Sequence, residues 1–126
     1  MSDIYVVGVG MTPFGKFLDR TVKDLSREAV NSSLTDAGAA KEDISAAFFA
    51  NTSQSPMEGQ YMVGGEIALR DMGFSEIPIS NVENACASAS TAFHLAYAHL
   101  KAYEARRARE MTIPAPRGTR KRESFK

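Results

Sequence analysis

The sequence contains a single cysteine, Cys86, among its 126 residues. One thiol excludes an internal disulfide framework and any zinc site built from several cysteines. No apolar run approaches the roughly 20 residues of a membrane-spanning helix. The apolar N-terminus lacks the preceding basic segment of a secretory signal. We therefore predict a protein of a reducing compartment, cytoplasmic and without a membrane span.

The chain also has no net charge, because 15 Lys and Arg balance 15 Asp and Glu. This neutrality conceals two unlike segments. Residues 1–100 carry six basic and twelve acidic side chains, whereas residues 101–126 carry nine basic and three acidic ones. The apolar content of 44% is too high for a disordered chain, and the length allows one domain with a core. We predict one domain over residues 1–103 and a basic, irregular and disordered tail over residues 104–126.

Hydrophobic periodicity predicts an alternation of strands and helices. The strands are expected at residues 4–9, 44–50 and 77–82, which are short apolar runs. Three helices are expected. The first runs from Thr21, which starts a capping box, to Gly38. The second covers residues 60–72, and the third runs from residue 85 to about residue 103. The order βαβαβα predicts an α/β fold with a mostly parallel sheet. That sheet is incomplete, because no fourth strand follows the last helix.

Two glycine-containing segments do not fit nucleotide-binding motifs. Gly8 and Gly10 follow the first expected strand, but Pro13 occupies the position of the third glycine of a dinucleotide fingerprint. Gly15-Lys16 lacks the spacing and the following Ser or Thr of a phosphate-binding loop. We therefore predict no bound nucleotide cofactor.

Cys86 is the residue whose surroundings point to chemistry. It follows the strand expected at residues 77–82 and lies among small residues in the first turn of the helix expected from residue 85. Unpaired N–H groups and the helix dipole at such a position stabilise a thiolate and prepare a nucleophile. A structural cysteine is the commoner fate of a lone thiol, so the residues alone leave both interpretations open.

The two histidines are poorly placed to serve this thiol as a base. Along one straight helix, His94 lies about 12 Å and His99 about 20 Å from Cys86, which is beyond hydrogen-bond reach. They are five residues apart and do not share a helix face as metal ligands four apart would. We predict packing or solvent-edge positions for both, and no metal site.

The basic C-terminal segment raises the question of a polyanionic partner. Its arginines cluster at residues 106–109 and 117–122. Aromatic residues are not interleaved with them, and no nucleic-acid-binding fold precedes them. We therefore predict a nonfunctional polar end and no nucleic-acid partner, and binding of nucleic acid or an anionic membrane surface by this segment is the weaker alternative. The change of charge where a strand is due also raises the hypothesis that residues from about 101 are translated out of frame.

Three blocks of the sequence resemble thiolases, at residues 5–16, 24–30 and 79–95. The third block, Ile-Ser-Asn-Val-Glu-Asn-Ala-Cys-Ala-Ser-Ala-Ser-Thr-Ala-Phe-His-Leu, is the most specific. The sterol-carrier-protein type, which includes acetyl-CoA acetyltransferases and lipid-transfer thiolases, is the most similar branch. The resemblance extends from residue 3 to about residue 100. It implies an N-terminal fragment of the thiolase fold, with the partial domain over residues 1–103.

The resemblance further implies that Cys86 is the nucleophile that accepts the acyl group of acyl-CoA as a thioester. Coenzyme A thioester is then a substrate and not a bound cofactor, and the family implies a homodimer. The loop at residues 51–60 is similar to the family segment that reaches the partner subunit's active site. The second half of a thiolase, with its catalytic histidines and second cysteine, is absent, so we expect negligible turnover by the lone chain.

Two alternatives stay open. One is a noncatalytic half-thiolase that pairs with another chain as an interaction or lipid-handling module, because an unpaired sheet edge invites partners. The other is a fragment of a ketoacyl-synthase-like condensing enzyme, which shares the cysteine before a helix. The Val-Gly-Val-Gly-Met-Thr opening favours the thiolase branch. The terminal Ser-Phe-Lys is not a peroxisomal address, although a peroxisomal location stays open for a eukaryotic relative.

Overall fold

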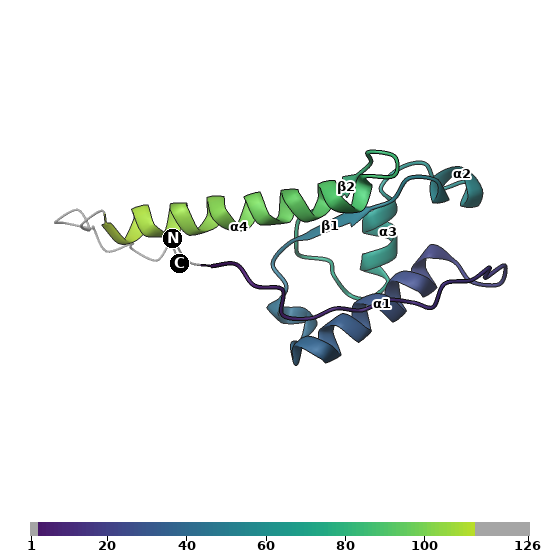
Figure 1. The fold of residues 1–126 in the computed structure, drawn as a ribbon, viewed down its shortest axis with the longest axis horizontal. Helices are drawn as coiled ribbons and strands as arrows, with labels where there is room; N and C mark the ends of the chain where they lie inside the picture. The colour runs from purple at the N-terminus through teal and green to yellow at the C-terminus, as the bar shows by residue number, and fades with distance from the viewer. Residues whose placement is uncertain (1–2, 113–126) are drawn as a thin grey trace, which may run out of the picture.

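The computed structural model describes residues 3–112, with side chains up to residue 107. Figure 1 shows the elements in chain order. They are α1 (Val22–Ala37), the 3-10 turn η1 (Lys41–Asp43), β1 (Ala47–Ala50), α2 (Gln54–Glu58), α3 (Gly64–Arg70), β2 (Ile79–Val82) and α4 (Ser88–Thr112). The alternation of helices with strands confirms the α/β class.

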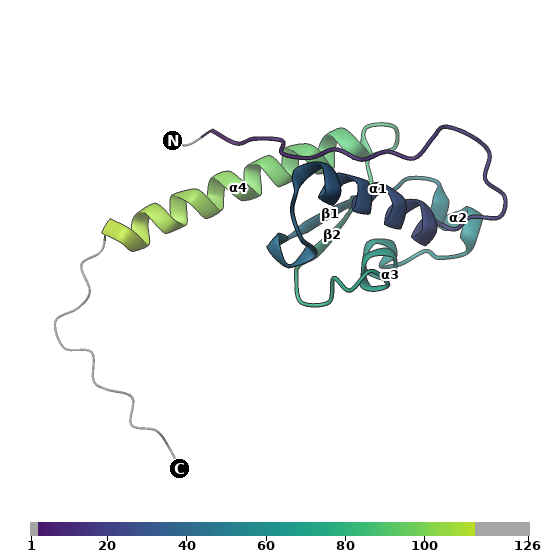
Figure 2. The same cartoon turned by 90° about the horizontal axis from the view of Figure 1, so that it is seen from below.

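The two strands form a parallel sheet between two helical layers. Ala47 pairs with Ile79 and Ala50 with Val82 at the two ends of the ladder. Helix α4 covers one face, and α1 and α3 lie on the other (Figures 1 and 2). A β-strand directs successive side chains to opposite faces. Accordingly, Phe48 meets the ring of His99 on α4 at 5.7 Å between centroids, whereas the next residue, Phe49, contacts α3.

The N-terminal segment is not the strand that its sequence predicts. Residues 4–9 run extended along α1 and belong to no strand, so the described sheet has two strands where three were expected. The side chains of Tyr5, Val6 and Val7 are 66–74% exposed. β-Branched residues favour a strand where their side chains pack on a half-buried, pleated sheet. In the described part of the chain, no neighbouring strand pairs with residues 4–9 to form such a sheet.

Glycines explain why this segment lies on α1. An added Cβ at Gly8 would lie 2.4 Å from the carbonyl oxygen of Ser33, and one at Gly10 would lie 2.0 Å from that of Ala29. The backbone N–H of Val9 donates to Asp36 Oδ2 at 2.9 Å. The absence of side chains at two positions therefore permits direct contact between the segment and the helix backbone.

Helix α1 starts and ends where the sequence predicts. Thr21 is the N-cap, its hydroxyl accepting the N–H of Asp24, and its own N–H donates to Asp24 Oδ2 at 2.9 Å. Gly38 ends the helix at φ 62°. The backbone N–H and then the hydroxyl of Thr21 lower the pKa of Asp24 most, and Arg27 and Arg20 lower it further.

This capping box gives a pH-dependent contribution to stability. A carboxyl whose folded-state pKa is lowered stabilises the protein above its unfolded pKa, about 4, and this contribution is lost as the pH falls through the folded value. We expect Asp24→Asn to lower the free energy of unfolding at neutral pH and to flatten its decline below about pH 4. Urea unfolding at several pH values measures both effects. Asp19→Asn is the control, and equal pH profiles for the two variants would contradict the prediction.

Helix α3 is shorter than the helix expected at residues 60–72. It begins at Gly64 because Val63 adopts a left-handed conformation at φ 49°. Asn81 on β2 holds this start. Its Oδ1 accepts the N–H of Gly65 at 2.7 Å, and its Nδ2 donates to Glu66 Oε2 at 2.6 Å. Separately, the loop expected at residues 51–59 contains the short helix α2.

Helix α4 begins later and extends further than predicted. It runs from Ser88 to Thr112, so residues 104–112 are helical where an irregular tail was expected. Ala, Arg and Glu favour helix in this stretch. Residues 113–126, where the rest of the expected tail falls, lie outside the described residues. The described part of α4 also presents apolar side chains to solvent, namely Phe93, Leu95, Tyr97, Leu100 and Tyr103, which are 40–65% exposed.

Candidate active site

Cys86 lies in the segment that joins β2 to α4. Its side chain is exposed and forms no disulfide. It comes two residues before Ser88, the first residue of α4, at the carboxyl end of the parallel sheet. In open α/β sheets this edge is where ligands bind. The thiol follows a strand, as predicted, but it lies in the turn before α4 and not in the first turn of a helix that starts at residue 85.

Hydrogen bonds between the turn and α4 hold the backbone around the cysteine. Ser88, a buried polar residue, accepts the N–H of Asn84 at 2.8 Å through its hydroxyl oxygen and donates to the carbonyl of Ala85 at 2.8 Å. The amide Nδ2 of Asn84 donates to the hydroxyl of Thr91 at 3.0 Å. These contacts anchor the residues that precede Cys86 to the first turn of α4.

Ala85, directly before the cysteine, has an unusual backbone conformation. Its φ of 46° lies in the left-handed region, which costs a residue with a Cβ about 1–3 kcal/mol. The surrounding bonds sustain this conformation. The N–H of Ala87 donates to the carbonyl of Asn84 at 2.9 Å, and that of Ser88 donates to Ala85 at 3.2 Å.

Glu83 is a candidate site residue that the sequence pattern does not reveal. Its Oε1 accepts the N–H of Ala85 at 2.7 Å and the hydroxyl of Thr52 at 3.0 Å. The N–H of Ala85, followed by the Thr52 hydroxyl, lowers the pKa of this carboxyl. The available signal was a carboxylate three residues before the cysteine, but its partner Thr52 is 31 residues away. No local pattern reveals such a pairing.

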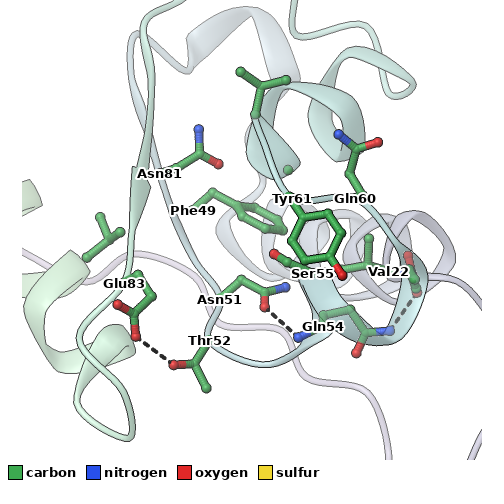
Figure 3. Close-up of a pocket in the computed structure, with 14 residues that line it drawn as sticks. Val22, Phe49, Asn51, Thr52, Gln54, Ser55, Gln60, Tyr61, Asn81 and Glu83 are labelled. Atoms are coloured by element: carbon green, nitrogen blue, oxygen red, sulfur yellow. Dashed lines mark hydrogen bonds between the residues drawn. The ribbon is translucent and has the colours of Figure 1, made fainter.

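A cavity of about 190 Å³ opens beside Glu83 at the same edge of the sheet (Figure 3). It is bounded by the loops that follow β1 and β2 and by the starts of α1 and α3. Its lining residues are Val22, Phe49, Asn51, Thr52, Gln54, Ser55, Glu58, Gln60, Tyr61, Val63, Gly64, Asn81, Val82 and Glu83. The loop at residues 51–60 thus forms much of its wall, whereas Cys86 does not line it.

Hydrogen bonds fix one wall of this cavity. Asn51 Oδ1 accepts the N–H of Gln54 at 3.1 Å, and Gln54 Nε2 donates to Glu58 Oε1 at 2.6 Å. The same Glu58 oxygen accepts the N–H of Val22 at 2.9 Å and so ties α2 to the start of α1. The loop after β1 is therefore braced against the helical layer.

Both histidines of the sequence lie on α4, beyond the thiol. His94 and His99 follow Cys86 by eight and thirteen residues. At 1.5 Å per residue they lie about 9 Å and about 16 Å along α4 from its first residue, Ser88. His99 contacts the ring of Phe48 and both histidines are exposed, which agrees with the packing or solvent-edge positions predicted for them.

The described residues contain neither a metal cluster nor a membrane helix. No three His, Cys, Asp or Glu side chains among them lie close enough together to hold a metal ion. Within the same part of the chain, no helix combines the length and apolar character needed to cross a bilayer.

The part of the sequence that forms the cysteine turn, the parallel sheet and the flanking helices matches a known protein family. Residues 4–108 match the thiolase N-terminal domain, so the chain belongs to the thiolase family. The match extends past residue 101 into the basic segment, whereas the resemblance was expected to end at about residue 100.

Among its relatives is an acetyl-CoA acetyltransferase of Methanocaldococcus jannaschii, 34% identical over 76% of this chain and 24% of that protein. A non-specific lipid-transfer protein-like 2 of Caenorhabditis elegans is 37% identical over 73% of this chain and 22% of the relative. Sterol carrier protein 2 of Gallus gallus is 35% identical over 73% of this chain and 16% of the relative. The chain thus spans a quarter or less of the length of these relatives.

Proposed function

We propose that this chain carries the nucleophile side of a thiolase active site, with Cys86 accepting an acyl group from acyl-CoA. The observation that carries the proposal is the position of an exposed thiol beside the N-terminus of α4, within the segment that matches the thiolase family. Relatives named acetyl-CoA acetyltransferase support the substrate class. A homodimer and a cytoplasmic location are further parts of this proposal.

The chemistry is the transfer of an acyl group from one sulfur to another. The Cys86 thiolate attacks the thioester carbonyl carbon of acyl-CoA, a new carbon–sulfur bond forms, and the bond to the coenzyme A sulfur breaks. Coenzyme A leaves as a thiolate and takes up the proton that the cysteine released. The histidines lie too far along α4 to act as a base. One acyl group per chain is therefore expected, without rapid turnover.

Acylation of the purified chain by acetyl-CoA tests the proposal. The intact mass should increase by one acetyl group, and hydroxylamine should remove the group, as it cleaves thioesters. Peptide mapping should place the acetyl group on Cys86. An unchanged mass in a folded sample whose Cys86 still reacts with iodoacetamide would contradict the proposed function.

The exposed apolar side chains favour a second candidate, an interaction module. Tyr5, Val7, Phe93, Tyr97 and Leu100 are all 45–74% exposed. Large exposed apolar surfaces mark sites of protein association.

Association through these exposed apolar side chains leads to a direct prediction. We expect light scattering to detect assemblies larger than a monomer, and Tyr97→Glu to shift them toward the monomer. Lys23→Glu on α1 changes charge without removing an exposed apolar side chain and serves as the control. A monodisperse monomer at all concentrations would exclude this function.

A further inference from the structure

One carboxylate oxygen connects the cysteine turn to a second loop. Glu83 Oε1 accepts both the backbone N–H of Ala85 and the side-chain hydroxyl of Thr52. Figure 3 shows the Glu83 and Thr52 side chains directed toward each other from the ends of neighbouring strands. Thr52 lies in the loop that follows β1, so this oxygen joins two loops that are distant in the sequence.

The hydrogen bond to Glu83 holds the backbone of Ala85, which has an unfavourable conformation. Ala85 is left-handed at φ 46°, and Cys86 follows it directly. A residue with a Cβ keeps such a conformation only where its surroundings enforce it. The Glu83 carboxylate accepts the N–H of Ala85. The Ser88 hydroxyl accepts the N–H of Asn84 and donates to the carbonyl of Ala85.

We propose that Glu83 is a positioning residue that sets the location of Cys86 by holding the Ala85 amide and coupling it to Thr52. This inference rests on the proposed function, because it assigns Glu83 a role toward the acyl-accepting thiol. Glu83 touches neither the thiol nor the acyl group in this role. Its effect passes through the backbone of Ala85.

The surroundings of Glu83 favour its ionised form, in which both carboxylate oxygens can accept hydrogen bonds. The Ala85 and Thr52 bonds lower the pKa of Glu83, so the side chain remains ionised at neutral pH. Other titratable groups near this turn are Glu58 and Tyr61, which line the same cavity, and Cys86 itself. On α4, the first titratable side chain is His94, in the second turn of the helix.

A pair of variants separates the hydrogen bond from the charge. Glu83→Gln and Glu83→Ala both remove a negative charge near Cys86, but only glutamine retains an oxygen acceptor for the Ala85 amide. We expect iodoacetamide to alkylate Cys86 about tenfold more slowly in Glu83→Ala than in Glu83→Gln. The reason is that the freed turn no longer holds the thiol beside the start of α4. Glu76→Gln, on the segment that precedes β2, is the charge control and should match the parent protein.

A spectroscopic measurement reports on the turn independently of thiol chemistry. In nuclear magnetic resonance spectra, the Ala85 amide proton should shift with pH as Glu83 titrates, with a midpoint below the ordinary glutamate value of about 4.3. This transition should disappear in both Glu83 variants. Thr52→Val should raise the midpoint, because it removes one of the two bonds that lower the pKa of Glu83.

The outcomes distinguish the inference from the proposed function. Equal alkylation rates for folded Glu83→Gln and Glu83→Ala would overturn the positioning role, as would an Ala85 amide that does not respond to acid titration. Failure of acetyl-CoA to acylate the parent protein would instead overturn the acyl-transfer function. In that case the amide titration and the alkylation difference would still report on Glu83.

Discussion

The substitution Cys86→Ala is expected to abolish acylation of the chain by acetyl-CoA, while the protein remains folded. Cys86 is the single cysteine of the sequence, so no other thiol can form the thioester. Its side chain is exposed, and alanine creates no cavity in the core. Intact mass spectrometry should detect one acetyl group on the parent protein and none on the variant.

Two further variants sharpen this result. Cys86→Ser should also remain unacylated, because a serine hydroxyl without an adjacent base is a weak nucleophile. Ser90→Ala changes another exposed residue in the first turn of α4 and should retain the parent behaviour. Acetyl incorporation that persists in Cys86→Ala would show that another side chain reacts and would refute the assignment.

The second large effect is expected at Gly65, where α3 lies directly against the sheet. An added Cβ would lie 2.6 Å from the Cβ of Phe49 and 2.8 Å from Asn81 Oδ1. Neither neighbour can withdraw easily, because Phe49 is part of β1 and Asn81 bonds the N–H of Gly65 itself. Overpacking of this kind costs about 1–3 kcal/mol, so Gly65→Ala should lower the free energy of unfolding by that amount.

The neighbouring glycine provides a matched control. An added Cβ at Gly64 meets no atom within 4 Å, and the residue is also in α3. Gly64→Ala should be neutral or slightly stabilising, because alanine favours helix over glycine. Urea unfolding of both variants measures the difference. Equal stability of the two would show that α3 does not approach the sheet as closely as described.

Several features could be predicted because their signals are local. The capping box of Thr21 and Asp24 and the terminal Gly38 mark both ends of α1, since capping bonds join residues a few positions apart. The apolar runs that contain β1 and β2 were predicted in the same way, as was the place of Cys86 between a strand and a helix, although the helix begins three residues later than expected. The family assignment followed from the residues around this cysteine.

Other features could not be predicted, because they depend on partners far along the chain. Residues 4–9 have the composition of a strand, but a strand also requires a neighbour that supplies ladder hydrogen bonds. The start of α3 depends on the conformation of Val63 and on Asn81, which is 16 residues from Gly65. Neither contact has a signature within the helix itself.

The sequence by itself determined the α/β class, the family and the chemical identity of the candidate nucleophile. Only the tertiary structure decided that Glu83 and Thr52 join the two loops at the carboxyl edge of the sheet, and that the N-terminal segment lies on α1. The physical reason is the range of the interactions. Capping bonds and hydrophobic periodicity act over a few residues, whereas parallel strand pairing brings together loops that are separated by a whole crossover.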